Sequence, residues 1–237
     1  MDRRQVLITA SAAAMVGTLP RNVFAQDADN APTIVDFTLG DPDAPVEVIE
    51  YASFTCPHCA TFHDQVLPQI KRDYVETGKV RFVYREVYFD RPGLWAAMVA
   101  RCAGEMRYFG VVDMIYRNQA AWTQGDAATI AGNLRRIGLS AGLEDAEIDA
   151  CMQDAETAQA MLDNSEANRV EYPIEGTPAL VIDGTLYGNM SYEDIAARMR
   201  CANKDSQSNR LDTLLSSAIP NAGAAASTST AWRTWRP

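Results

Sequence analysis

The distribution of apolar residues predicts a strand, a helix and a second strand in the first half of the chain. Residues 46–51 follow the turn-forming segment 41–45 and are mostly apolar, which predicts a central β-strand. From Phe62 to Tyr74, apolar side chains recur every four residues and predict a helix with one buried face. Residues 80–87 alternate and predict the second strand. This order predicts a βαβ unit with parallel strands and a right-handed crossover.

Proline and glycine mark the limits of this helix. Pro57 suits the first helical position, because the missing N–H of proline costs nothing there. Pro68 predicts a kink, and Gly78 predicts the end of the helix. The predicted helix therefore begins directly after Cys56.

The pattern changes to amphipathic helices between residues 94 and 170. Strand character returns at 179–182, and Asp183-Gly184 predicts a hairpin turn into a strand at 185–187. We therefore predict an α/β fold in which an all-helical domain, residues 94–170, is inserted into a sheet domain. The sheet domain comprises residues 37–93 and 171–201, and a last helix ends near Cys201.

The two ends of the chain have a different character. Arg3-Arg4, a weakly apolar run and a small-residue site at Ala25 are typical of a twin-arginine-like export signal, so we predict that residues 1–25 are a signal peptide. A buried amphipathic helix is the alternative. Residues 26–36 are predicted to be a flexible lead-in, and residues 202–237 a largely disordered tail with room for one short helix.

Composition narrows the class of protein. The net charge is −10, which argues against nucleic-acid binding, because neutralising phosphates requires Lys and Arg. No run of 18 apolar residues follows the signal, so we expect a soluble mature protein. An exported chain can keep disulfides, and its five cysteines leave one thiol unpaired.

The motif Cys56-Pro57-His58-Cys59 carries the clearest chemistry. Its position at a strand-to-helix junction puts the Cys56 sulfur near a helix N-terminus, where free N–H groups and the macrodipole favour a thiolate. Cys59 lies one turn inward and should be a buried resolving thiol. His58 should add to the stabilisation of the Cys56 thiolate. Stabilising that thiolate makes the disulfide form an oxidant.

Two other interpretations of this motif stay open. A zinc site would need four ligands, and only the two cysteines with His58 or His63 lie close together in the sequence. An inert structural disulfide is the second alternative. We predict a redox dithiol with no metal and no cofactor, because thiol–disulfide exchange needs no prosthetic group.

The segment from Glu50 to Cys59, with Phe62 downstream, resembles the DsbA family of periplasmic thiol-disulfide oxidoreductases, including its alpha-proteobacterial members. The resemblance extends to the segment 176–178, which is similar to the cis-proline loop of thioredoxin-like proteins. It covers most of residues 36–201 and implies a thioredoxin-like fold. It does not cover the tail.

The resemblance implies roles for three further residues. Pro178 would be cis and lie against the Cys56 sulfur, and the Thr177 backbone would pair with substrate as an added strand. Glu50 matches an acid that assists proton transfer to the buried thiol. The alternatives are an ordinary trans proline and a solvated carboxylate at a strand end. His63 and Thr177 depart from the best-known members, and this leaves the choice of substrate open.

The remaining cysteines are assigned by the same resemblance. Alpha-proteobacterial relatives carry an extra disulfide, so we predict a bond between Cys102 and Cys151, with two buried free thiols as the alternative. Cys201 would then be unpaired and buried on the last helix.

The function implied is that of a monomeric periplasmic oxidase. Its substrates would be unfolded exported proteins with free thiols, and a DsbB-like membrane quinone reductase would regenerate it. The short lead-in leaves little room for a dimerisation domain, which favours an oxidase over an isomerase or reductase. A peptide-binding chaperone is the alternative from a different class.

Overall fold

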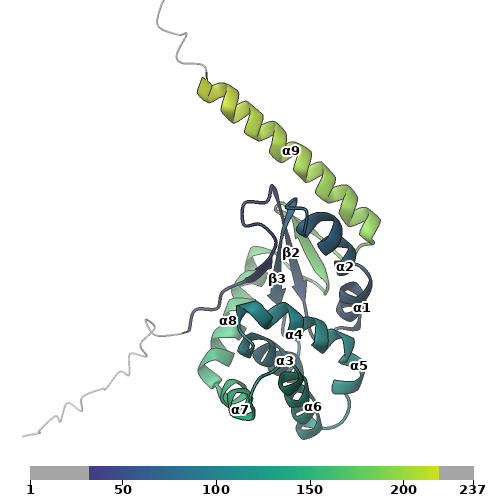
Figure 1. Ribbon diagram of the computed structural model, residues 1–237, viewed down its shortest axis with the longest axis vertical. Helices are drawn as coiled ribbons and strands as arrows, with labels where there is room; N and C mark the ends of the chain where they lie inside the picture. Colours follow the sequence, from purple (N-terminus) through teal and green to yellow (C-terminus); the bar gives the residue numbers. More distant parts are fainter. Residues whose placement is uncertain (1–31, 219–237) are drawn as a thin grey trace, which may run out of the picture. The chain divides into compact units, whose positions relative to one another are not determined.

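The computed structural model describes residues 32–218 (Figure 1). The predicted signal peptide 1–25, most of the lead-in and residues 219–237 lie outside the described residues. The chain forms an α/β fold in which six consecutive helices separate the first three strands from the last two. In chain order they are β1 (Phe37–Leu39), β2 (Val46–Ala52), α1 (Pro57–Gln65), α2 (Leu67–Ile70), the π-helical η2 (Lys71–Val75), β3 (Val80–Glu86), α3 (Arg91–Cys102), α4 (Glu105–Arg117), α5 (Gln119–Trp122), α6 (Ala127–Ser140), α7 (Asp145–Gln153), α8 (Ala155–Glu171), β4 (Ala179–Ile182), β5 (Thr185–Tyr187) and α9 (Tyr192–Ala218).

The strands form one five-stranded mixed sheet in the order β1-β3-β2-β4-β5. β2 and β3 pair in parallel, as the βαβ pattern predicts, and the other pairs are antiparallel. Six of the seven residues of β2 are buried, which explains its nearly continuous apolar sequence. The short strand β1 was not predicted, and it pairs with the outer edge of β3.

Alternate residues of β2 face two separate cores, as the period of a strand requires. Val46 and Val48 belong to the larger core, which includes residues of α1, α2, α3 and α9. Ile49 and Tyr51 belong to the smaller core on the other face. Figure 1 shows α1 and α2 on one side of the sheet and α8 on the other.

The structure contains the predicted helix break at Pro68 and the predicted turn at Asp183-Gly184. α1 ends at Gln65 and α2 begins at Leu67, so the helix is interrupted next to Pro68. Asp183 and Gly184, at φ 47° and 80°, form the turn between β4 and β5. Both residues of such a turn need a positive φ, which explains the Asp-Gly pair.

The helical block is longer than the sequence pattern predicts, running from Arg91 to Glu171 rather than from 94 to 170. Its start is set by Asp90, whose carboxylate accepts a hydrogen bond from the Gly93 N–H at 2.7 Å. Its last helix, α8, also contacts the sheet, because Ser165 Oγ donates to the backbone oxygen of Glu86 at 2.9 Å.

The last helix corrects two predictions. α9 does not end near Cys201 but continues to Ala218, so residues 202–218 are helical rather than disordered. Cys201 is exposed and not buried, because the buried face of α9 is formed by Ile195, Ala196 and Met199. No helix within residues 32–218 combines the length and the apolar character needed to cross a bilayer.

Candidate active site

The dithiol lies where β2 passes into α1. Cys56 is the N-cap residue of α1 and Pro57 follows at the first helical position, as predicted. Cys56 is partly exposed, whereas Cys59, one turn further, is fully buried. Both are free thiols in this structure, so it describes the reduced form of the pair.

Side chains from two helical segments hold the loop before Cys56. Gln119, a buried residue of α5, donates through Nε2 to the backbone oxygens of Phe54 and Cys56 at 2.7 and 2.9 Å. Thr55 Oγ1 donates to Asp90 Oδ2 at 2.8 Å, before the start of α3. The helical block therefore holds the loop that carries Cys56, contacts that the sequence pattern did not reveal for Gln119 or Asp90.

The cis-proline loop faces Cys56 because of the strand register. β4 pairs antiparallel to β2, with Tyr51 opposite Ala179, so the residues before Ala179 lie beside those that follow β2. The peptide bond between Thr177 and Pro178 is cis. In the thiol form, Cys56 Sγ donates to the Thr177 backbone oxygen at 3.2 Å.

The pKa values of the two thiols are shifted in opposite directions. A hydrogen bond from the Cys59 thiol is the largest cause that lowers the pKa of Cys56 to about 5, helped by the backbone N–H groups of Cys59 and His58. The pKa of Cys59 is raised strongly, first by burial, then by the bond to Cys56 and the nearby Glu50 charge. Cys56 is therefore the more acidic and more accessible thiol of the pair, which are the properties that a nucleophilic cysteine needs.

His58 stabilises Cys56 through its main chain. Its backbone N–H is among the causes that lower the pKa of Cys56, whereas its imidazole ring is exposed. The helix N-terminus therefore accounts for the effect of this residue without a charged ring.

A buried acid–histidine pair lies beneath the dithiol. Glu50 and His63 are 0% and 6% exposed, and Glu50 Oε2 lies 3.0 Å from His63 Nε2. Glu50 is therefore not a solvated carboxylate at a strand end. The family resemblance identified Glu50 but not its partner. The spacing of His63, four residues after Cys59, could have indicated it, because this spacing puts both residues on one face of α1.

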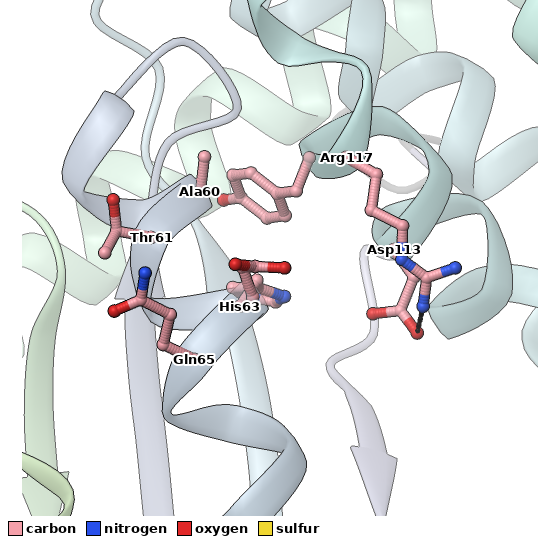
Figure 2. Close-up of a pocket in the computed structure, with 8 residues that line it drawn as sticks. Ala60, Thr61, His63, Gln65, Asp113 and Arg117 are labelled. Atoms are coloured by element: carbon pink, nitrogen blue, oxygen red, sulfur yellow. Dashed lines mark ion pairs between the residues drawn. The ribbon is translucent and has the colours of Figure 1, made fainter.

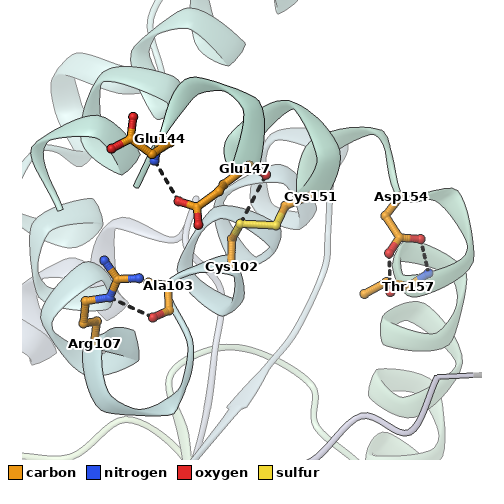
Figure 3. Close-up of a disulfide and its surroundings, with 8 residues drawn as sticks. All are labelled: Cys102, Ala103, Arg107, Glu144, Glu147, Cys151, Asp154 and Thr157. Atoms are coloured by element: carbon orange, nitrogen blue, oxygen red, sulfur yellow. Dashed lines mark hydrogen bonds between the residues drawn. A yellow bond between two sulfur atoms is a disulfide. The ribbon is translucent and has the colours of Figure 1, made fainter. Parts of the chain in front are cut away.

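A disulfide joins α3 to α7 in the helical block (Figure 3). Cys102 Sγ and Cys151 Sγ are 2.03 Å apart, and the Cα atoms are separated by 6.0 Å. Figure 3 shows Glu144 and Glu147 at the start of α7, where Glu147 Oε2 accepts from the Glu144 N–H at 2.8 Å. Among the described residues, no group of three or more His, Cys, Asp or Glu is placed to hold a metal ion.

We expect this disulfide to stabilise the fold and to leave thiol exchange at Cys56 and Cys59 unaffected. Replacing both cysteines by alanine should lower the free energy of unfolding by about 4 kcal/mol, since the bond closes a loop of 49 residues. Urea unfolding of the oxidised protein and of the Cys102→Ala/Cys151→Ala variant measures the difference. Equal stabilities, or two alkylated thiols in a non-reducing peptide map of the native chain, would contradict it.

A dithiol of this polarity at the start of a helix, opposite a cis-proline, defines a thiol-disulfide oxidoreductase of thioredoxin-like fold. Comparisons agree with this class. A family model described as Thioredoxin matches residues 32–221. A Rickettsia bellii protein that bears the name protein-disulfide oxidoreductase is 30% identical over 178 residues, which cover 75% of this chain and 68% of the relative. The chain spans 58–63% of the length of four further Rickettsia relatives.

Solved structures give the same assignment. Wolbachia pipientis alpha-DsbA1 is 26% identical with a TM-score of 0.68, over 76% of this chain and 97% of that chain. Oxidised BdbD from Bacillus subtilis shares the fold at 20% identity and a TM-score of 0.63, over 71% and 93% of the two chains. The chain belongs to the DsbA family of thiol-disulfide oxidoreductases.

Proposed function

We propose that this protein is a periplasmic oxidase that introduces disulfides into unfolded exported proteins through Cys56 and Cys59. The observation that carries the proposal is the polarity of the pair: an accessible Cys56 with a pKa of about 5 above a buried Cys59 with a strongly raised pKa. A stabilised Cys56 thiolate favours the reduced form, so the disulfide form is the better oxidant.

The reaction consists of two exchanges. A substrate thiolate attacks Cys56 Sγ of the oxidised protein; the Cys56–Cys59 bond breaks, a mixed disulfide forms, and Cys59 leaves and takes up a proton. A second substrate thiolate then attacks the substrate sulfur of the mixed disulfide, and Cys56 leaves as a thiolate. The substrate loses two electrons to the dithiol. No prosthetic group takes part in these steps.

The Thr177 backbone beside Cys56 would bind the substrate peptide as an added strand, next to Pro178. Regeneration needs an acceptor for two electrons, and we propose a DsbB-like membrane quinone reductase. A monomer suffices for both exchanges, because all the residues that carry them lie in one chain.

The direction of electron flow is tested by the reduction potential of the dithiol against glutathione. We expect a potential of about −120 mV, as in DsbA, rather than about −270 mV, as in thioredoxin. A potential close to the thioredoxin value would make the protein a reductant and overturn the proposed oxidase activity.

The same preparation gives the acidity of Cys56. The thiolate is the reactive form, so the rate of alkylation should rise with pH around a midpoint near pH 5 and be constant above about pH 7, because the pKa is lowered to about 5. In the Cys59→Ser variant, a serine hydroxyl replaces the thiol that donates a hydrogen bond to Cys56. The midpoint of the alkylation curve should therefore differ from that of the native protein. A native midpoint at the ordinary cysteine value of about 8.5 would contradict the proposed polarity.

A further inference from the structure

Buried polar atoms without a partner are concentrated around the dithiol. Among the described residues, four buried side-chain nitrogen or oxygen atoms have no hydrogen-bond partner, and three of them are Glu50 Oε1, His63 Nδ1 and Thr177 Oγ1. Buried polar groups are normally satisfied, so such a concentration needs an explanation. Two of the three atoms are the free ends of the Glu50–His63 pair, whose other ends lie 3.0 Å apart.

A pocket of about 350 Å³ lies beside this pair, between α1 and α4. Figure 2 shows His63 between Thr61 and Gln65 of α1 on one side and the Asp113–Arg117 ion pair of α4 on the other. Much of the lining is polar, which suits water. His63 is thus the buried residue of the pair that also lines a pocket.

The aromatic rings around His63 fix its orientation. Its ring centroid is 4.2 Å from that of Tyr116, and the edge of the Tyr84 ring meets it at 5.6 Å and 90°. Tyr84 and Tyr116 are fully or almost fully buried and are joined by a hydrogen bond of 2.7 Å between their hydroxyl groups. The ring is therefore held with one nitrogen at Glu50.

The Glu50 end of the pair acts on the buried thiol of Cys59. Cys59 and His63 are one turn apart on α1 and both are buried. The charge of Glu50 acts on Cys59, since it contributes to the raised pKa of that thiol. His63 thus lies between a pocket with a polar lining and Glu50, whose charge acts on the buried sulfur of Cys59.

We propose that His63 is a proton-relay residue that connects the pocket, through Glu50, with Cys59. The proposal rests on the roles proposed above for Cys56 and Cys59. When the disulfide opens, His63 passes a proton through Glu50 to the departing Cys59 thiolate, and water in the pocket returns a proton to His63.

The relay resets within one catalytic cycle. When the dithiol is reoxidised, the proton of Cys59 moves through Glu50 to His63, and His63 releases a proton to water in the pocket. One proton enters as Cys59 leaves the disulfide and one leaves as the disulfide forms again. The buried thiol therefore exchanges protons without being exposed.

The experiment follows the step in which Cys59 must lose its proton. Reduced protein is mixed with oxidised glutathione, the reaction is quenched with acid, and the mixed disulfide on Cys56 is counted by mass spectrometry over time. In His63→Gln, which can bond to Glu50 but cannot relay a proton, we expect resolution of the mixed disulfide by Cys59 to slow by about tenfold or more. The equilibrium with glutathione should change by less than about twofold, because glutamine can keep the hydrogen bond to Glu50 in both redox states.

Chemical rescue separates a relay from a structural role. Imidazole added to His63→Ala should enter the space left by the ring and restore part of the rate of resolution. Gln65→Ala is the matched control, because Gln65 lines the same pocket and is exposed on α1, and its rates should equal those of the native protein. If His63→Ala does not fold, the His63→Gln rate and equilibrium decide the question.

Three outcomes would overturn the relay. They are an unchanged rate in His63→Gln, a rate that falls only in parallel with a shifted equilibrium, or no rescue of a folded His63→Ala protein by imidazole. The native protein tests the proposed function separately. If it forms no mixed disulfide at Cys56, the roles of the cysteines are wrong, whereas rapid resolution in both native and His63→Gln proteins removes the relay alone.

Discussion

Replacing Cys56 with serine is expected to lower the rate of disulfide exchange by about a thousandfold or more, as loss of a nucleophile does in other enzymes. Cys59 cannot take over, because it is fully buried and its pKa is strongly raised. The measurement is the rate at which the protein forms a disulfide in a reduced two-cysteine peptide, with a small disulfide oxidant in excess.

Two further variants sharpen this experiment. Cys59→Ser keeps the acidic Cys56 but lacks the resolving thiol, so mixed disulfides on Cys56 should accumulate. Cys201→Ser is the matched control, because Cys201 is also a free thiol, is exposed and lies on α9. This variant should exchange disulfides at the native rate. Substantial exchange by Cys56→Ser would mean that the buried thiol reacts, contrary to the structure.

The strands and turns of the sheet could be predicted because their patterns are local. The β2 run, buried on six of seven positions, and the Asp183-Gly184 turn each carry a signal within a few residues. β1 has only three residues, and its strand structure depends on pairing with β3. Between Cys201 and Leu211, the α9 sequence is largely polar, so no apolar stripe carries the helix across this stretch.

The site divides in the same way. The dithiol motif and the cis-proline segment are short motifs, and the sequence predicts where they lie. The contacts that complete the site join distant segments: Gln119 Nε2 reaches back to Cys56, and His63 of α1 meets Glu50 of β2. A pattern along one element cannot show such contacts, because they depend on how the elements pack.

The second large effect is expected in the free energy of unfolding, at a buried ion pair between β3 and α3. Arg101 Nε and Nη2 donate to the two carboxylate oxygens of Glu86 at 2.8 and 2.6 Å, and the side chains are only 11% and 4% exposed. Tyr108 donates its hydroxyl to the same carboxylate at 2.6 Å. The Arg101 guanidinium also lies 5.1 Å from the Phe37 ring of β1.

Arg101→Ala should lower the free energy of unfolding by about 3–5 kcal/mol, because it leaves the Glu86 carboxylate buried without its cation. The variant also loses contact with Phe37, so β1 should loosen. Urea unfolding at neutral pH measures the loss of stability, and amide hydrogen exchange in β1 measures the loosening.

Arg81→Ala is the matched control for this ion pair. Arg81 also extends from β3 and donates to Glu47 at 2.9 Å, but both side chains are more than a third exposed. Solvent screens such a pair, so its loss should cost less than about 1 kcal/mol. If Arg101→Ala were no more harmful than Arg81→Ala, the Glu86 carboxylate would have to gain water or a new donor at little cost. In Arg101→Ala only the Tyr108 hydroxyl still donates to this carboxylate, and it supplies no positive charge, so the two variants should differ clearly.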